Sequence, residues 1–294
     1  MGATETAAAP TELDDEMAGL DALEVSTRAR KPFLRRTWDA AWPKLAAVVL
    51  AVGLWQLVVW SGWKPQYVLA GPAAAFSSLS AMLTDGTLTE AVLVTLRRAV
   101  VGFAAALVIG VVVGSLVARV RLLRAAFGSL ITGIQTMPSI AWFPLAILLF
   151  GLSERAIFFV VVLGAAPAIA NGLIAGVDHI PPILVRAGRV LGARGLTAYR
   201  HVILPAALPE FVTGLKQGWA FAWRSLMAGE LLVIIANQPS LGALLDANRQ
   251  FSDSAGLIAT MIVILIIGIA IDALVFGMLD RAVRRRWGLI DQAG

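Results

Sequence analysis

Three charged residues that lie within mostly apolar stretches are the side chains best suited to do chemistry. Arg224 and Glu230 lie in the apolar region Leu208–Ile235, and Asp272 lies at the end of another. Ionisable groups within apolar spans are costly, so they face protein, water or one another. Six residues turn a helix by about 240°, so Arg224 and Glu230 need separate partners. The guanidinium could attract a small anion in a polar pathway, or it could form an interhelical structural ion pair.

No catalytic or metal-binding constellation is evident in the sequence. Cysteine is absent, and the two histidines, His179 and His201, are too few for a typical zinc site. The pattern G-x-x-x-x-G-K-[ST] is also absent, so the chain carries no standard phosphate-binding loop. We therefore expect a protein that is not an enzyme and that holds no cofactor of its own.

The composition indicates a membrane protein. Hydrophobic residues make up 59% of the 294 residues and charged residues 15%, whereas soluble domains are about 45–50% apolar. A spanning helix needs roughly 20 mostly apolar residues. Together with Leu208–Ile235, which could instead be a buried or re-entrant segment, the apolar stretches predict an all-α membrane protein of about six transmembrane helices. The other five stretches are Leu45–Trp63, Ala99–Ala118, Ala125–Ser153, Ala156–Val177 and Ser254–Ile271.

The basic residues predict the orientation of these helices. With the N-terminus inside, 17 of the 24 Lys and Arg residues fall in inside segments and 5 in outside segments. Inside loops of membrane proteins carry the excess of positive charge, so we expect a multi-pass membrane protein with both termini in the cytoplasm. The basic residues flank apolar runs, so the net charge of +5 indicates membrane lipid, and not nucleic acid, as a partner.

The composition also divides the chain into segments. Residues 1–40 begin with an acidic, Ala-rich stretch that lacks a signal-peptide pattern and continue with basic residues from Arg28 to Arg36. We expect a disordered, basic cytoplasmic tail there. The first transmembrane helix is expected over 41–68, with Pro43 at its start. A core of five transmembrane helices is expected over 69–289, and a short tail over 290–294.

Prolines interrupt the third apolar stretch at Pro138, which follows Met137, and at Pro144. Proline removes a backbone donor and clashes with the preceding turn. Transport proteins use broken membrane helices to line pathways, although a kinked structural helix is an equally good interpretation.

Three glycine pairs with the spacing GxxxG predict close packing between helices, and by themselves they do not establish a dimer. They are Gly110 with Gly114, Gly172 with Gly176, and Gly214 with Gly218.

The loop 178–207 lies between two expected spans and is the most informative segment. Pro182 suits the first turn of a short helix, and Gly192 suits its end. A second short helix is expected from Leu196 to Leu204, stopping at Pro205. Such a pair forms a compact cytoplasmic knob, which is a shape suited to docking in a partner's groove. In the later connector 237–253, Leu241, Leu244 and Leu245 predict another small helix, over 241–248.

In the loop 178–207 the chain resembles the permeases of ABC importers, which carry an EAA motif there. The spacing aligns Arg186-Ala187-Gly188, then Gly192, then Leu204-Pro205 with that motif. Arg186 stands where the family has glutamate, and Gly188 where it has the second alanine. The resemblance implies a fold like that of type I ABC importer permeases. It also implies that Arg186, Ala187, Gly188, Gly192, Leu204 and Pro205 couple the chain to an ATPase.

From about Leu69 to Leu289 the chain is most similar to the sulfonate, nitrate and taurine branch of these permeases. The matching segments are Thr95–Arg98, Gln135–Pro138, Pro144–Glu154 and Trp223–Glu230. The resemblance implies a translocation pathway for a small oxyanion, with an aliphatic sulfonate as the first candidate and nitrate or taurine next. From the broken span, the charges and these segments, we take Gln135, Met137, Pro138, Arg224 and Glu230 as pathway residues.

The resemblance further implies a homodimer of permeases, two separate ATP-binding subunits that hold ATP and Mg, and an extracytoplasmic solute-binding protein. A rigid lever between two spans can transmit the motion of such an ATPase. The alternative function is a stand-alone secondary transporter or channel, which would need neither ATP nor a docking loop. A membrane enzyme is the third class.

Overall fold

A computed structural model describes residues 33–286 of the chain, and every regular element in that range is a helix. By its internal contacts the chain divides into residues 1–55 and residues 56–294, and each unit is described by itself. Most of the predicted tail 1–40 lies outside the described residues, as does the predicted tail 290–294, whereas the last residues of the first tail, from Phe33 on, are helical.

The first unit contributes most of helix α2 (Phe33–Trp60), whose residues Ala41–Trp60 are long and apolar enough to cross a membrane. Pro43 lies near the start of the candidate span, as expected, although the helix itself begins ten residues earlier, at Phe33. The bilayer tolerates an interior proline where the freed backbone group finds another partner. The helix ends at Trp60, and the chain turns at Gly62, whose φ is +67°.

The second unit supplies the remaining spans. Helices α4 (Thr87–Arg119) and α7 (Glu154–Asp178) and the continuous run Ser254–Arg286 meet the requirements for spanning. A bent pair of helices between α4 and α7 would make one more. Helix α10 (Leu204–Leu232) is long enough at 29 residues but carries four charged side chains. With α2 and α10 included, the described chain has the predicted architecture of about six membrane helices.

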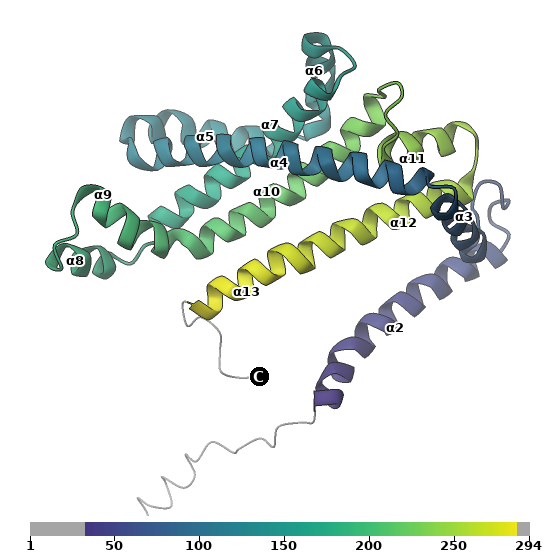
Figure 1. Ribbon diagram of the computed structural model, residues 1–294, viewed down its shortest axis with the longest axis horizontal. Coiled ribbons are helices and arrows are strands. Elements are labelled where there is room, and N and C mark those ends of the chain that lie inside the picture. The colour runs from purple at the N-terminus through teal and green to yellow at the C-terminus, as the bar shows by residue number, and fades with distance from the viewer. Residues whose placement is uncertain (1–32, 287–294) are drawn as a thin grey trace, which may run out of the picture. The chain divides into compact units, whose positions relative to one another are not determined.

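The core of the second unit is the packing of α7 between α4 and α10, which run alongside it (Figure 1). Glycine lets the helix backbones approach: a Cβ added at Gly172 would lie 2.5 Å from the Cα of Gly214. On the other side of α7, a Cβ at Gly110 would lie 2.8 Å from the carbonyl oxygen of Ala166. The prediction that the GxxxG pairs mediate close helix packing is therefore confirmed within one chain.

The third predicted span is broken. Helix α5 (Arg121–Thr136) ends just before Pro138, a short 3₁₀ turn η1 (Ser139–Trp142) follows, and α6 (Phe143–Phe150) leaves at a bend of 100°. Met137 and Pro138 have extended backbone angles, as proline and the residue before it prefer. Pro144 starts α6 and does not kink it, because its missing amide donor is not needed in a first turn.

Helix α12 (Ser254–Ile271) continues through a π-helical turn η3 (Asp272–Phe276) into α13 (Gly277–Arg286). The turn places the buried ring of Phe276 against two aromatic side chains, with centroid distances of 6.1 Å to Phe103 and 6.0 Å to Trp219. Edge and tilted ring contacts of this kind add to the area they bury. They join the run α12–α13 to α4 and α10.

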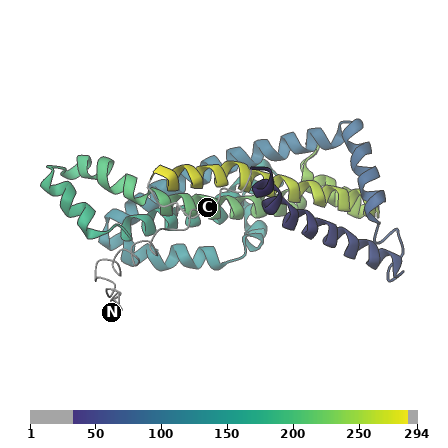
Figure 2. The same cartoon turned by 90° about the horizontal axis from the view of Figure 1, so that it is seen from below.

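Most of the predicted loop 178–207 is helical. Helix α8 (Pro182–Val190) begins at Pro182 and is closed by Gly192 with φ +85°, as predicted. The expected stop at Pro205 is wrong, because α9 (Gly195–Ala198) passes through a π-helical turn η2 (Tyr199–Ile203) directly into α10. Pro205 falls in the first turn of α10, where proline fits. Two views place α8 and α9 at one end of α10 (Figure 1 and Figure 2).

The opposite end of α10 is covered by short helices. Helix α11 (Leu241–Gln250) confirms the small helix predicted in the connector, and α3 (Pro72–Thr84) precedes α4. Leu241 is buried with Leu88 and Ala91 of α4. This packing fixes α11 against the first turns of α4.

Candidate functional site

Four of the five predicted pathway residues line one pocket in the second unit. Gln135, Met137, Pro138 and Arg224 surround a cavity of about 350 Å³. Its walls come from the end of α5, the turn η1, and α7 and α10. We call it the Arg224 pocket. The structure thus brings together residues that lie almost 90 positions apart in the chain, and their role in transport stays a prediction.

The pocket owes its opening to the break in the third span. The extended backbone at Met137 and Pro138 ends α5, and η1 then carries Ser139, Ile140 and Trp142 along the cavity. Backbone of this kind is tolerated at membrane depth where it lines a cavity or is covered by protein. The break places Pro138 in the lining of the cavity, whereas Pro144 lies in the first turn of α6, outside that lining.

The lining of the pocket carries positive charge and no negative charge. No Asp or Glu is among the lining residues, and Arg224 is exposed with no hydrogen bond or ion pair to any residue in the described part of the chain. The rest of the wall is apolar or carries hydroxyl, amide or indole groups. A guanidinium presents a fork of donors that matches an oxyanion. The arrangement can bind a small anion by charge and hydrogen bonds.

Glu230, the fifth predicted pathway residue, lies outside the lining of this pocket. It is fully buried, and its Oε1 accepts a hydrogen bond from Nη1 of Arg98 at 3.2 Å. Glu230 follows Arg224 by six residues, about 9 Å along α10 and on a different face. The expected separate partner of Glu230 is therefore Arg98 of α4, and its pathway role stays a prediction.

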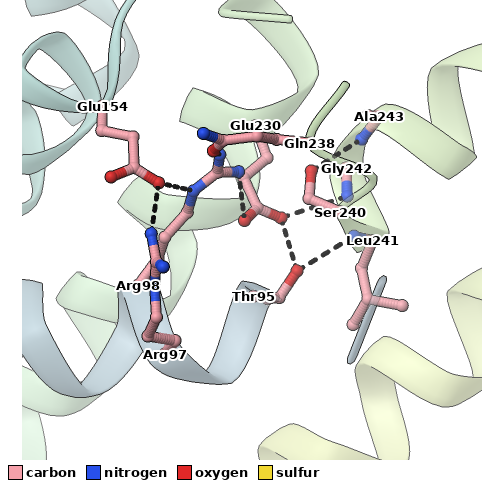
Figure 3. Close-up of polar contacts among 10 residues, drawn as sticks. All are labelled: Thr95, Arg97, Arg98, Glu154, Glu230, Gln238, Ser240, Leu241, Gly242 and Ala243. Carbon is pink, nitrogen blue, oxygen red and sulfur yellow. Dashed lines mark hydrogen bonds and ion pairs between the residues drawn. The ribbon is translucent and has the colours of Figure 1, made fainter. Parts of the chain in front are cut away.

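Arg98 is the centre of a polar cluster that includes Thr95, Glu154, Glu230 and Gln238, and that we call the Arg98 cluster (Figure 3). Its Nε donates to Oε1 of Glu154 at 3.0 Å and its Nη2 to Oε1 of Gln238 at 2.6 Å. The side chain of Arg98 is only 2% exposed. Every donor-bearing nitrogen of this guanidinium thus has an acceptor, which is what a buried charge requires.

The same cluster holds the start of α11. Thr95 donates to Oε2 of Glu230 at 2.8 Å and accepts the backbone N–H of Leu241 at 2.9 Å (Figure 3). The backbone N–H of Gly242 donates to the same oxygen of Glu230 at 3.2 Å. The first amides of a helix lack internal partners, and a carboxylate near them is favourable. Glu230 therefore caps α11 from a neighbouring helix.

Sequence reasoning missed this cluster. Arg97 and Arg98 were placed in an outside segment, but both belong to α4, where Arg97 is 63% exposed and Arg98 is buried. Two signals could have identified Arg98. A carboxylate inside a span, such as that of Glu230, needs a cation as its partner, and Thr95 lies one helical turn before Arg98 on the same helix face. The rotation of α4 about its axis decided which of the two adjacent arginines is buried.

Other charged side chains of this unit are also paired. Nζ of Lys216 and Oδ2 of Asp272 are 3.1 Å apart, with both side chains about half exposed. On α11, hydrogen bonds from Arg249 and then Gln250 lower the pKa of the Asp246 carboxyl, against the opposing effect of its burial. The Lys216–Asp272 pair shows that Asp272, like Glu230, is partnered.

The predicted coupling residues lie at the other end of the unit, in the elbow of residues 179–203 and the start of α10. Gly188 packs on Val202, so that a Cβ added there would lie 2.8 Å from a methyl group. Val190 and Leu191, next to Gly192, are 87% and 86% exposed. Arg186 and Ala187 are also exposed on α8, and Leu204 and Pro205 begin α10.

The elbow is joined firmly to the helices above it. Nη2 of Arg124 lies 2.6 Å from Oδ1 of Asp178, and the guanidinium of Arg119 lies over the ring of Tyr199 at 4.2 Å. The Arg119–Tyr199 contact ties α4 to one end of the elbow, and the Arg124–Asp178 pair joins α5 to α7 at the residue before the elbow. A force applied to the exposed tip would therefore reach α4 through Tyr199 and α7 through the chain itself.

Comparisons with known proteins agree with this geometry. Residues 106–287 match the family model described as the binding-protein-dependent transport system inner membrane component. A protein of Methanocaldococcus jannaschii named as an ABC transporter permease is 30% identical, over 78% of this chain and 86% of its own. The taurine transport system permease protein TauC of Escherichia coli is 28% identical, over 83% of this chain and 90% of its own.

The fold is also similar to that of a solved structure. An inward-facing MetNI methionine ABC transporter chain superimposes with a TM-score of 0.56 at 22% identity, and the match covers 68% of this chain and 95% of that chain. At this identity the likeness concerns the fold, which is that of type I ABC importer permeases, as predicted.

Proposed function

The chain belongs to the family of binding-protein-dependent transport system inner membrane components, and from this premise we propose that it is the permease subunit of an ATP-driven importer of small oxyanions. The observation that supports an anionic substrate is the Arg224 pocket, where a cation with no partner among the described residues faces a cavity whose lining includes no acidic residue. Such a cation in a membrane span needs an anionic or aqueous partner.

The substrate that we favour is an aliphatic sulfonate, with taurine and nitrate next. The similarity to a taurine permease supports this order, as does the geometry of a guanidinium toward a group with several oxygens. The cavity of about 350 Å³ is at the small end of the usual range of about 300–1,000 Å³ for ligand sites. A small solute fits this size.

The energy for transport comes, in this proposal, from two separate ATP-binding subunits that hold ATP and Mg. The elbow supports this role, because Val190 and Leu191 form an apolar tip that is almost fully exposed. Exposed apolar side chains together with Arg186 and Arg189 suit a partner's groove. A second copy of the permease and an extracytoplasmic solute-binding protein complete the transporter, and both termini lie on the cytoplasmic side of the bacterial plasma membrane.

The direct test is uptake by the assembled transporter in proteoliposomes. The permease, its co-purified ATPase and its solute-binding protein should accumulate labelled methanesulfonate or taurine only when ATP and Mg are supplied on the ATPase side. Leu191→Asp should abolish association with the ATPase, because a carboxylate would replace the apolar tip. Arg124→Ala, at the half-exposed ion pair away from the tip, is the control and should leave association intact.

A stand-alone secondary transporter or channel would give the opposite result. Deleting residues 186–192 would then leave conductance or exchange unchanged, and uptake would not depend on ATP. Uptake by the wild-type chain alone, without an ATP-binding subunit, would rule out the importer.

A further inference from the structure

A hydrogen bond joins two amide side chains beside the Arg224 pocket. Nδ2 of Asn171 on α7 donates to Oε1 of Gln135 on α5 at 2.7 Å. Gln135 lines the pocket and Asn171 does not. Asn171 lies seven residues after Gly164, two turns along the same face of α7, and Gly164 also lines the pocket. The bond therefore lies beside the pocket, further along the same face of α7.

In the structure, the amide of Gln135 turns its oxygen toward Asn171. A glutamine amide has one acceptor oxygen and one NH₂ donor group. Its oxygen is occupied by Asn171, and no described residue accepts from its Nε2. Within the described residues, Ser225 Oγ is the buried side-chain polar atom without a partner, so Nε2 of the half-buried Gln135 keeps access to open space. The pocket thus receives a donor.

We propose that the Arg224 pocket is a substrate site for small organic oxyanions, in which Arg224 and the Gln135 NH₂ group bind the oxygens and Asn171 is the positioning residue that holds Gln135 with its donor inward. This inference rests on the proposed function and adds to it the residues that bind and position the substrate. The remaining wall includes Met137, Ile140, Leu163 and Phe221. These side chains are apolar, so they favour an anion with a short alkyl group over a bare inorganic anion.

The alternative orientation of Gln135 would oppose this function. With Nε2 toward Asn171, the carbonyl oxygen would face the pocket and repel an anion. Asn171→Asp enforces that orientation, because a carboxylate only accepts hydrogen bonds. Asn171→Leu removes the bond while keeping a side chain of similar size. The two variants therefore separate loss of positioning from reversal of positioning.

Binding to the purified permease–ATPase complex in nanodiscs, without the solute-binding protein, is the measurement. Titration calorimetry with methanesulfonate and with nitrate reports the pocket directly. We expect methanesulfonate to bind more tightly than nitrate, Asn171→Leu to weaken its binding about tenfold, and Asn171→Asp to weaken it more. In a Gln135→Leu background, Asn171→Leu should have no further effect, because residues that act through one another are not additive.

Asn248→Leu is the matched control, because Asn248 also donates from its amide to a neighbouring helix, to Oγ1 of Thr260 at 3.3 Å, away from the pocket. It should leave binding unchanged. The inference is overturned if the wild-type complex binds no methanesulfonate, if Asn171→Leu behaves like the control, or if its effect adds fully to that of Gln135→Leu.

ATP-dependent uptake measured on the same preparation separates the two proposals. Intact uptake without binding at the pocket overturns this inference alone. Absence of ATP-dependent uptake by the complete wild-type transporter overturns the proposed function, and with it the assignment of the pocket to transport.

Discussion

Two arginines of this protein, Arg98 and Arg224, lie in opposite surroundings. Arg98 is buried and donates to Glu154, Glu230 and Gln238. Arg224 is exposed to a pocket without acidic residues and has no partner within the described residues. A buried charge with all its hydrogen bonds made fixes one arrangement of helices. A charge left without a partner beside a cavity is available to a ligand.

The surroundings of the two arginines, without any sequence motif, distinguish a charge that holds helices together from a charge that is available to a ligand. Both arginines lie in helices that span or border the membrane, and both stretches resemble the same permease branch. Their environments differ because α4 presents Arg98 to two carboxylates, whereas the break after α5 leaves space in front of Arg224. The predictions below test this difference, from the largest expected effect to the smallest.

Arg98→Ala should destabilise the fold severely. The substitution leaves the fully buried carboxylate of Glu230 without its cation, and breaking a buried pair costs about 3–5 kcal/mol. The thermal unfolding midpoint of the detergent-purified chain measures this loss. Arg97→Ala is the matched control, because Arg97 contacts the same Glu154 but is 63% exposed, and exposed pairs contribute about 0–1 kcal/mol. Equal effects of the two substitutions would contradict the structural role of the Arg98 cluster.

Arg224→Ala should leave the unfolding midpoint close to that of the wild type but reduce transport. Hydrogen bonds to charged groups contribute about 1.5–3 kcal/mol, so binding of a sulfonate should weaken by roughly 10- to 100-fold. Calorimetry and uptake assays measure this change. Lys216→Ala, at the ion pair with Asp272, serves as the control for removal of a membrane cation. If Arg224→Ala retained full uptake, Arg224 would be excluded from the pathway.

Gly164→Ala should affect the pocket more than the fold. A Cβ at Gly164 would lie 2.6 Å from the hydroxyl oxygen of Ser225, so this hydroxyl, which has no hydrogen-bond partner among the described residues, must turn away or α7 and α10 must shift. Overpacking of this kind costs about 1–3 kcal/mol. Ligand affinity should fall together with a modest loss of thermal stability. Gly133→Ala on α5 meets no atom within 4 Å and should change neither quantity.

Asp246 should give the smallest effect, visible only in acid. Its pKa is lower in the folded chain than in the unfolded chain because of Arg249 and Gln250. The stabilisation is therefore present above the unfolded pKa, for which the ordinary value is 3.8, and is lost as the pH falls through the folded value. The difference in unfolding midpoint between wild type and Asp246→Asn should shrink below about pH 4. A constant difference across that range would contradict the assignment.

The elbow shows how far local sequence rules reach. Pro182 and Gly192 set the ends of α8 correctly, because the preferences of proline for a first turn and of glycine for positive φ are local properties. Pro205 did not end its helix, because a π-helical turn placed it in the first turn of α10. Whether a proline stops or starts a helix depended on the turn before it.

The sequence by itself determined the membrane helices, the close helix contacts at glycine, the break near Pro138 and the family, because hydropathy, residue size and backbone chemistry act over a few neighbouring positions. Only the tertiary structure decided which charges are paired. Glu230 meets Arg98 from a position 132 residues away, and Gln135 meets Asn171 across two helices. Such pairs depend on the rotation of each helix about its axis, and packing of the whole helix sets that rotation.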